Sequence, residues 1–227
     1  MLSHHQEAGA RRRRRLALAV LGVTASLAVL AGPATDADAA PIRPTGVAGN
    51  SHSPAVAALA ASALEARDIY AYTGEAGAFH TYAQRLGVTT DALAAEFATD
   101  PAVVRAAFER SDFEHQTAAL AALSQLGKPY RYATSDPGVG FDCSGLTAFA
   151  WRRAGVSLPQ QSSAQISVSP GVDPSVAEVG DLVQYPGHVM MYLGFGDAIV
   201  HAANHASDVE LSHASGRSRN WANPTGR

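Results

Sequence analysis

The chain has 227 residues, which is enough for one ordinary domain with additional segments but not for two large domains. Hydrophobic residues make up 47% of it and aromatic residues only 7%, so we expect one hydrophobic core. The formal net charge is −3 and the sequence after residue 39 contains no basic stripe, which makes nucleic acid and anionic membranes poor candidate partners.

The first 39 residues have the pattern of a secretory signal peptide. Five arginines at 11–15 precede an almost unbroken apolar run over 16–31, and Ala37-Asp38-Ala39 supplies the small residues that a signal peptidase requires. The alternative is an N-terminal anchor that is not cleaved. Cleavage would remove five arginines and three acidic residues and leave no later segment long enough to span a bilayer, so we expect a secreted, extracellular protein without stable membrane insertion.

Residues 40–53 are rich in Pro, Gly, Ser and Asn, which predicts a flexible linker. Residues 54–117 follow as an alanine-rich region with three or four short helices. Asp100-Pro101 predicts a helix start, because Asp caps well and Pro suits the first helical position; Thr90 predicts another start and Gly87 a stop before it. The sequence leaves open whether this region inhibits, binds a partner or acts as a spacer.

Residues 118–227 have a different pattern, which predicts a separate α+β domain. A helix over 118–127 and a second over 144–154 are expected, with a Gly- and Pro-containing loop at 130–140 between them. Strand patterns follow at 181–185, 188–193 and 198–202, joined by turn sequences. A helix followed by an antiparallel meander indicates a helix packed on an antiparallel sheet.

The chain's single cysteine, Cys143, is the first candidate for chemistry. It cannot form an intramolecular disulfide, so it is either inert and buried, intermolecular or reactive. Asp142 is a good N-cap, which places Cys143 in the first turn of a helix. There the free amides and the helix dipole would favour a thiolate and could hold an oxyanion. The alternative is a small apolar residue packed against the sheet.

His188 is the candidate general base, because it begins a predicted strand directly after the Pro186-Gly187 turn. His201 lies on the next strand, where antiparallel pairing could place it beside His188 to orient the ring. The remaining candidates, His205 and His213, are expected at the surface. None of these histidines has the spacing of a metal motif, so we expect no metal and no cofactor.

Six motifs, in order, resemble those of the NlpC-type peptidoglycan endopeptidases, a papain-like cysteine peptidase family. The resemblance covers about the last half of the chain, and its motifs are Gly127-Lys128-Pro129-Tyr130, Phe141-Asp142-Cys143-Ser144-Gly145-Leu146, Leu158-Pro159 with Ser162 and Gln165, Gly180-Asp181-Leu182-Val183, His188-Val189 with Tyr192-Leu193-Gly194, and His201-Ala202. It implies a papain-like fold, a catalytic triad of Cys143, His188 and His201, and substrate contacts by Tyr130, Asp142 and Ser144.

Two departures from the family pattern concern the groove rather than the triad. Arg131-Tyr132-Ala133 stands where the family usually has a tryptophan and two glycines, and Gln160 stands where it usually has arginine. The resemblance implies a cell-wall-associated cysteine peptidase that cuts peptidoglycan stem peptides after γ-D-glutamate. The alternatives are a papain-like amidase or acyltransferase acting on the cell wall, and a non-catalytic wall-binding protein.

Overall fold

The computed structural model describes residues 51–214 and 219–226, all within one compact unit that spans 42–227. The predicted signal peptide, 1–39, lies outside the described residues, as does the predicted linker up to residue 50. The linker's last residues are held in place rather than loose: Ser51 exchanges two backbone hydrogen bonds with Leu211, and the Ser53 side chain accepts from the N–H of Val56. The division into domains stays a prediction.

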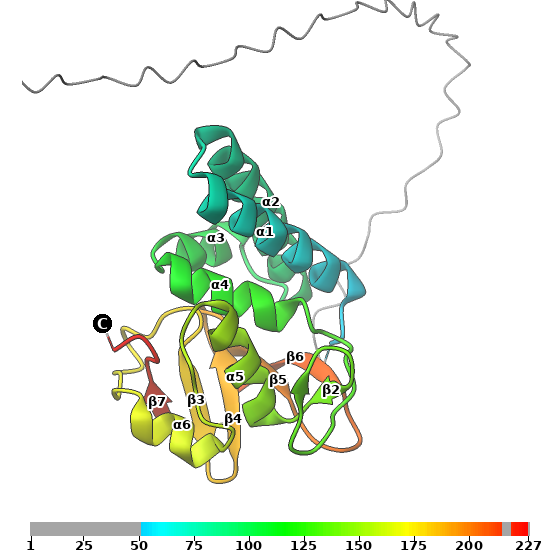
Figure 1. The fold of residues 1–227 in the computed structure, drawn as a ribbon, viewed down its shortest axis with the longest axis vertical. Coiled ribbons are helices and arrows are strands. Elements are labelled where there is room, and N and C mark those ends of the chain that lie inside the picture. The colour runs from blue at the N-terminus through cyan, green and yellow to red at the C-terminus, as the bar shows by residue number, and fades with distance from the viewer. Residues whose placement is uncertain (1–50, 215–218, 227) are drawn as a thin grey trace, which may run out of the picture. The chain divides into compact units, whose positions relative to one another are not determined.

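In the described part of the chain, six helices precede the five-stranded sheet (Figure 1). Their bounds are α1 (Pro54–Thr73), α2 (Ala76–Glu96), α3 (Pro101–Glu109), α4 (Phe113–Leu123), α5 (Cys143–Arg153) and α6 (Ser162–Val168). The helix start predicted at Asp100 is confirmed, because the Asp100 carboxylate accepts from the N–H of Ala102 and Pro101 begins α3.

The predicted helix stop at Gly87 and start at Thr90 are wrong, because α2 runs through both positions without a break. The Thr90 hydroxyl donates back to the Gly87 carbonyl, 2.8 Å away, instead of capping a new helix. Tyr82, Leu86 and Leu93 recur along one face of α2 and are buried. Burial of this continuous apolar face outweighs the local preference of glycine for a helix end.

Helix α4 begins at Phe113, five residues before the predicted start, because Asp112 caps it by accepting from the N–H of His115. It therefore crosses the expected boundary at 117/118. Every residue from His115 to Leu123 is buried. In Figure 1 α4 lies between α1 to α3 on one side and α5 with the sheet on the other, and it packs against both α1 and α5. One hydrophobic core thus continues from α1 into the sheet.

The predicted α+β architecture is confirmed by an antiparallel sheet with the strand order β6-β5-β4-β3-β7. The three predicted strands are β3 (Leu182–Tyr185), β4 (His188–Tyr192) and β5 (Ala198–Ala202). The edge strands β6 (Val209–His213) and β7 (Asn220–Ala222) were not predicted, nor was the small pair β1 (Ser135–Asp136) and β2 (Gly140–Phe141).

The two faces of the sheet bury different residues. Val189, Met191 and Val200 belong to the core that includes α5, which lies across the sheet in Figure 1. Met190 and Ile199 belong to a second cluster. Since side chains alternate along a strand, every second residue counted from Met190 on β4 and from Ile199 on β5 lies on this other face. Among the described residues no helix has both the length and the apolar character of a membrane span.

Candidate active site

Cys143 occupies the first position of α5, as predicted, because Asp142 caps the helix. Oδ1 of Asp142 accepts from the N–H of Gly145 at 2.6 Å. A side chain at Gly145 would collide with the carbonyl oxygen of Thr134, so glycine is required for the loop before β1 to pack against this turn. Oδ2 of Asp142 accepts from the N–H of Ala133 in the same loop, at 2.7 Å. One carboxylate thus fixes both the nucleophile's helix and the adjoining loop.

The protonation of Cys143 differs from the expectation of a favoured thiolate. Burial raises the pKa of the thiol, and the nearby Asp142 carboxylate raises it further, whereas the backbone N–H of Val189 lowers it. The net result is a pKa above the usual value. The capping carboxylate lies at the same helix end as the free amides, so it offsets the stabilisation of an anion by the helix dipole. The resting thiol is therefore protonated near neutral pH.

His188 begins β4 and contacts His201 of β5, so the predicted juxtaposition of the two histidines is confirmed. Nε2 of His188 lies 2.8 Å from Nδ1 of His201. The strand register pairs Tyr192 with Ile199, which makes the two histidines diagonal neighbours rather than direct partners. Burial, followed by repulsion from His201, lowers the pKa of His188 to about 4. His188 is thus a neutral base at neutral pH, and it directly precedes the residue whose N–H contacts the Cys143 sulfur.

The structure adds Glu210, which the sequence analysis did not single out. Glu210 lies on β6 directly opposite His201 and is only 1% exposed. Its Oε1 is 3.2 Å from Nε2 of His201. The sequence carries one relevant pattern, since Val209 and Leu211 alternate as in a strand. That pattern alone would assign the intervening glutamate to a solvent-exposed face.

An open cavity of about 530 Å³ adjoins the nucleophile. Its lining combines neutral polar and aromatic side chains with one charged residue, Asp142. The lining residues are Tyr130, Tyr132, Ala133, Ser135, Asp142, Cys143, Ser144, Gln160, Gln161, Ser162 and Gly187. None of them comes from α1 to α4, so the described part of the helical region does not cover this cavity.

The three predicted substrate contacts all line this cavity, but they differ in the hydrogen bonds that they already make within the protein. Burial raises the pKa of Tyr130, with a further contribution from Cys143, which places the phenol near the sulfur. Asp142 already accepts from two backbone N–H groups. The Ser144 hydroxyl lies 2.6 Å from the Gln160 carbonyl and 3.0 Å from Oδ1 of Asp142. Asp142 and Ser144 are therefore engaged in shaping the site, and their contact with substrate stays a prediction.

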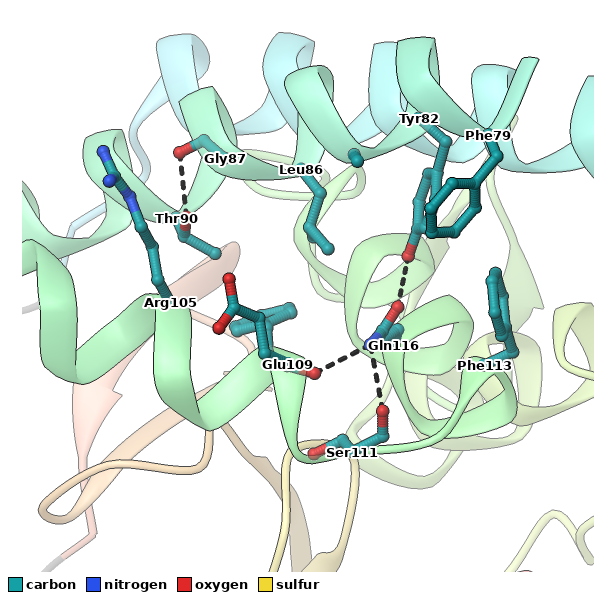
Figure 2. A pocket seen from close by; sticks show the side chains of 12 residues that line it. Phe79, Tyr82, Leu86, Gly87, Thr90, Arg105, Glu109, Ser111, Phe113 and Gln116 are labelled. Atoms are coloured by element: carbon teal, nitrogen blue, oxygen red, sulfur yellow. Dashed lines mark hydrogen bonds between the residues drawn. The ribbon is translucent and has the colours of Figure 1, made fainter. Parts of the chain in front are cut away.

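A second cavity, of about 390 Å³, lies between α2, α3 and α4 (Figure 2). Its wall is largely aromatic and aliphatic, with Phe79, Tyr82, Leu86, Phe108 and Phe113. The Tyr82 hydroxyl donates to Gln116 at 2.5 Å, and Gln116 in turn donates to two backbone carbonyls, as the dashed lines in Figure 2 show. The lining contains neither cysteine nor histidine, so this cavity holds no candidate nucleophile–base pair.

The remaining histidines of the C-terminal half lie at the surface, as expected. His205 is exposed and its ring meets Tyr130 edge-on, with 4.7 Å between ring centroids. His213 is exposed and pairs with Asp197. Within residues 51–214 and 219–226, no group of three or more His, Cys, Asp or Glu side chains is placed to hold a metal ion.

Comparison with known proteins relates part of this sequence to a family. Residues 127–224 match the model of the NlpC/P60 family. A bifunctional muramidase/DL-endopeptidase, CwlT, from Bacillus subtilis is 34% identical over 90 residues, which are 36% of this chain and 27% of the relative. A probable endopeptidase from Corynebacterium glutamicum is 40% identical over 87 residues, which are 37% of this chain and 41% of the relative. The chain therefore matches less than half the length of either protein.

Among solved structures, RipD from Mycobacterium tuberculosis aligns with a TM-score of 0.43 and 27% identity, covering 50% of this chain and 98% of that one. It is described as a non-catalytic NlpC/p60 domain protein adapted to peptidoglycan binding. The matched residues include the helix with Cys143, the strands with His188 and His201, and all the residues that line the cavity next to Cys143. Residues 127–224, in the C-terminal half of this chain, therefore match the NlpC/P60 family.

Proposed function

We propose that this protein is a secreted, cell-wall-associated cysteine endopeptidase that hydrolyses peptidoglycan stem peptides after γ-D-glutamate. The observation that carries the proposal is Cys143 at a capped helix start beside a cavity, together with a neutral His188 whose Nε2 lies 2.8 Å from Nδ1 of His201. The match of residues 127–224 to the NlpC/P60 family and the names of the endopeptidase relatives support the substrate class. Export rests on the sequence pattern of residues 1–39.

The proposed reaction begins with the protonated thiol. The Cys143 sulfur attacks the amide carbonyl while His188 accepts the thiol proton, so no thiolate has to exist beforehand. Backbone N–H groups at the start of α5, together with Tyr130, would hold the oxygen that becomes negative. His188 then passes the proton to the leaving amine, which leaves a thioester on Cys143. Water, deprotonated by His188, attacks the thioester and releases the carboxylate product with the free thiol.

The opposed pKa shifts of Cys143 and His188 support this order of events. A thiol with a raised pKa and an imidazole with a pKa of about 4 form a neutral pair at pH 7 rather than a thiolate–imidazolium pair. Proton transfer would therefore be coupled to attack on the carbonyl. Such a pair is protected from adventitious reaction until a substrate fills the cavity and supplies the carbonyl.

The cavity lining is suited to a peptide rather than to a highly charged ligand. The amide groups of a peptide can exchange hydrogen bonds with four polar side chains of the lining, those of Ser135, Gln160, Gln161 and Ser162. Tyr132 adds an exposed aromatic face. The muramidase half of the Bacillus subtilis relative's name is not carried over, because only about a quarter of that protein is matched.

Replacement of the nucleophile tests the proposal. Cys143→Ala should lower the rate of cleavage of purified peptidoglycan by at least about 10³-fold, because the acyl-enzyme can no longer form. The thermal midpoint should change little, since Cys143 is only partly buried. Asp197→Asn, on the surface and away from the cavity, is the matched control and should retain full activity. Equal cleavage by the Cys143→Ala variant and the unaltered chain would refute a cysteine peptidase.

A further inference from the structure

Glu210 has an unusual position for a carboxylate, because it is buried and faces a single polar group. It is 1% exposed, and Oε1 lies 3.2 Å from Nε2 of His201. Neither of these two buried atoms makes a hydrogen bond among the described residues, so their contact with one another is an ion-pair contact. A buried carboxylate without compensation is costly, so the contact with His201 is what offsets its burial.

The contact determines where the protons of the two histidines lie. An ionised carboxylate has no proton to donate and repels the lone pair of an unprotonated ring nitrogen, so we expect the proton of His201 on Nε2, the nitrogen that faces Glu210. Nδ1 of His201 is then unprotonated in the neutral ring and accepts from Nε2 of His188, 2.8 Å away. With its Nε2 protonated, a neutral His188 has its lone pair on Nδ1. That nitrogen is left free to take a proton.

We propose that Glu210 is a positioning residue that, through His201, fixes the tautomer of His188 that can act as base toward Cys143. The role rests on the proposed function, which it extends from three residues to four. Glu210 does not touch the substrate or the reacting atoms and acts only through the chain of contacts along β6, β5 and β4. Its second effect is electrostatic: when His188 becomes imidazolium during the reaction, the buried negative charge behind His201 partly balances it.

The chain provides a matched histidine–carboxylate pair for comparison. His213 and Asp197 also lie on the β5–β6 side of the sheet, and Nδ1 of His213 is 2.5 Å from Oδ1 of Asp197. Both are about half exposed, and neither lines the cavity next to Cys143. Loss of a carboxylate there removes a surface contact without altering the tautomers of His188 and His201.

The first experiment compares Glu210→Gln, Glu210→Asp and Asp197→Asn by steady-state kinetics. Glutamine keeps the size of the side chain, but its amide can either donate or accept, so it no longer enforces one tautomer. We expect kcat of Glu210→Gln to fall about 10- to 100-fold with KM little changed, as for other groups that orient a functional imidazole. Glu210→Asp should recover part of kcat, because it restores an acceptor, and Asp197→Asn should match the unaltered chain.

The second experiment reads the tautomers directly and needs no substrate. Nitrogen-15 NMR of the histidine rings in the unaltered chain should show His188 and His201 both protonated on Nε2, and a mixture of tautomers in Glu210→Gln. An unprotonated Nε2 on His201 in the unaltered chain would overturn the proposal whether or not any variant folds. So would a folded Glu210→Gln variant with unchanged tautomers and kcat. Absence of cleavage by the unaltered chain would instead count against the proposed function, and the tautomer result would still stand.

Discussion

Two histidines, His115 on α4 and His188 on β4, have opposite electrostatic surroundings. His115, on α4, is 1% exposed; its Nδ1 lies 2.8 Å from Oδ1 of Asp112 and its Nε2 lies 3.4 Å from Oδ1 of Asp181. Burial lowers the pKa of His115, but the two carboxylates outweigh burial and leave it above the usual value. His188 has another histidine as its neighbour, and burial together with that neighbour lowers its pKa to about 4.

The difference separates a histidine whose surroundings favour the charged form from one whose surroundings favour the neutral form. His115 is charged at mildly acidic pH and joins the helical region to the sheet, since Asp181 immediately precedes β3 and the Trp151 ring packs edge-on against it. His188 stays neutral and keeps a lone pair available, which is the state that a general base requires. The same residue type therefore takes two protonation states in this protein. The neighbouring carboxylates favour the charged form of His115, and the neighbouring imidazole favours the neutral form of His188.

Removal of α1 to α3 should have the largest effect, because it uncovers the helix that carries His115. Every residue of α4 from His115 to Leu123 is buried, and α1 supplies part of the cover. A chain that begins at Asp112 should show no cooperative thermal unfolding and no cleavage. A chain that begins at Ser51 is the control and should unfold cooperatively. A stable, active fragment from Asp112 would show instead that the helical region is only a spacer.

His115→Leu should have the second-largest effect, which is a loss of stability without a loss of catalytic activity. The substitution leaves Asp181, which is 0% exposed, as a buried charge without its partner. We expect the free energy of unfolding to fall by about 3–5 kcal/mol, measured by urea denaturation, while kcat per folded molecule stays the same.

Two further variants sharpen the His115 result. The double variant His115→Leu with Asp181→Asn should recover part of the lost stability, because the uncompensated charge is gone. His213→Leu removes a half-exposed pair and should cost no more than about 1 kcal/mol. If His115→Leu is as mild as His213→Leu, the buried ion pair does not hold the two regions together.

The pH dependence of stability is the smallest expected effect. The raised pKa of His115 adds stability that is complete below the unfolded value near 6.5 and is lost as pH rises through the folded pKa. The lowered pKa of His188 adds stability that is complete above about 6.5 and is lost as pH falls toward 4. Each histidine contributes a slope of at most about 1.4 kcal/mol per pH unit.

Urea denaturation between pH 4 and pH 8 separates these two contributions. His115→Leu should flatten the curve above pH 6.5, and His188→Gln should flatten it between pH 4 and 6.5. Curves for both variants that run parallel to that of the unaltered chain would contradict the assigned protonation states.

Local sequence signals predicted the parts of the site that depend on neighbouring residues in the chain. Asp142 was recognised as a cap because capping requires only a short polar side chain before the helix. His188 and His201 were placed together because a short turn between two strands allows only antiparallel pairing. The thiol's raised pKa was missed because it depends on burial, which no local pattern reports.

The features that the sequence did not reveal depend on long-range packing. Gly87 resembled a helix stop, yet the buried face of α2 carries the helix through it. Glu210 became visible only through the register that sets it opposite His201. Its strand, β6, was missed because only Val209 and Leu211 alternate there, which is too short a pattern to predict a strand.

The most direct test of the account is mass spectrometry of products released from a defined muropeptide by residues 42–227, the compact unit that contains the site. We expect one cut, between γ-D-glutamate and the following diamino acid, and none with Cys143→Ala. Release of the whole peptide from the sugar, or transfer of the acyl group to an added amine, would identify an amidase or acyltransferase. An intact muropeptide that nevertheless binds would identify a wall-binding protein and contradict the central claim that Cys143 is an acyl-accepting nucleophile.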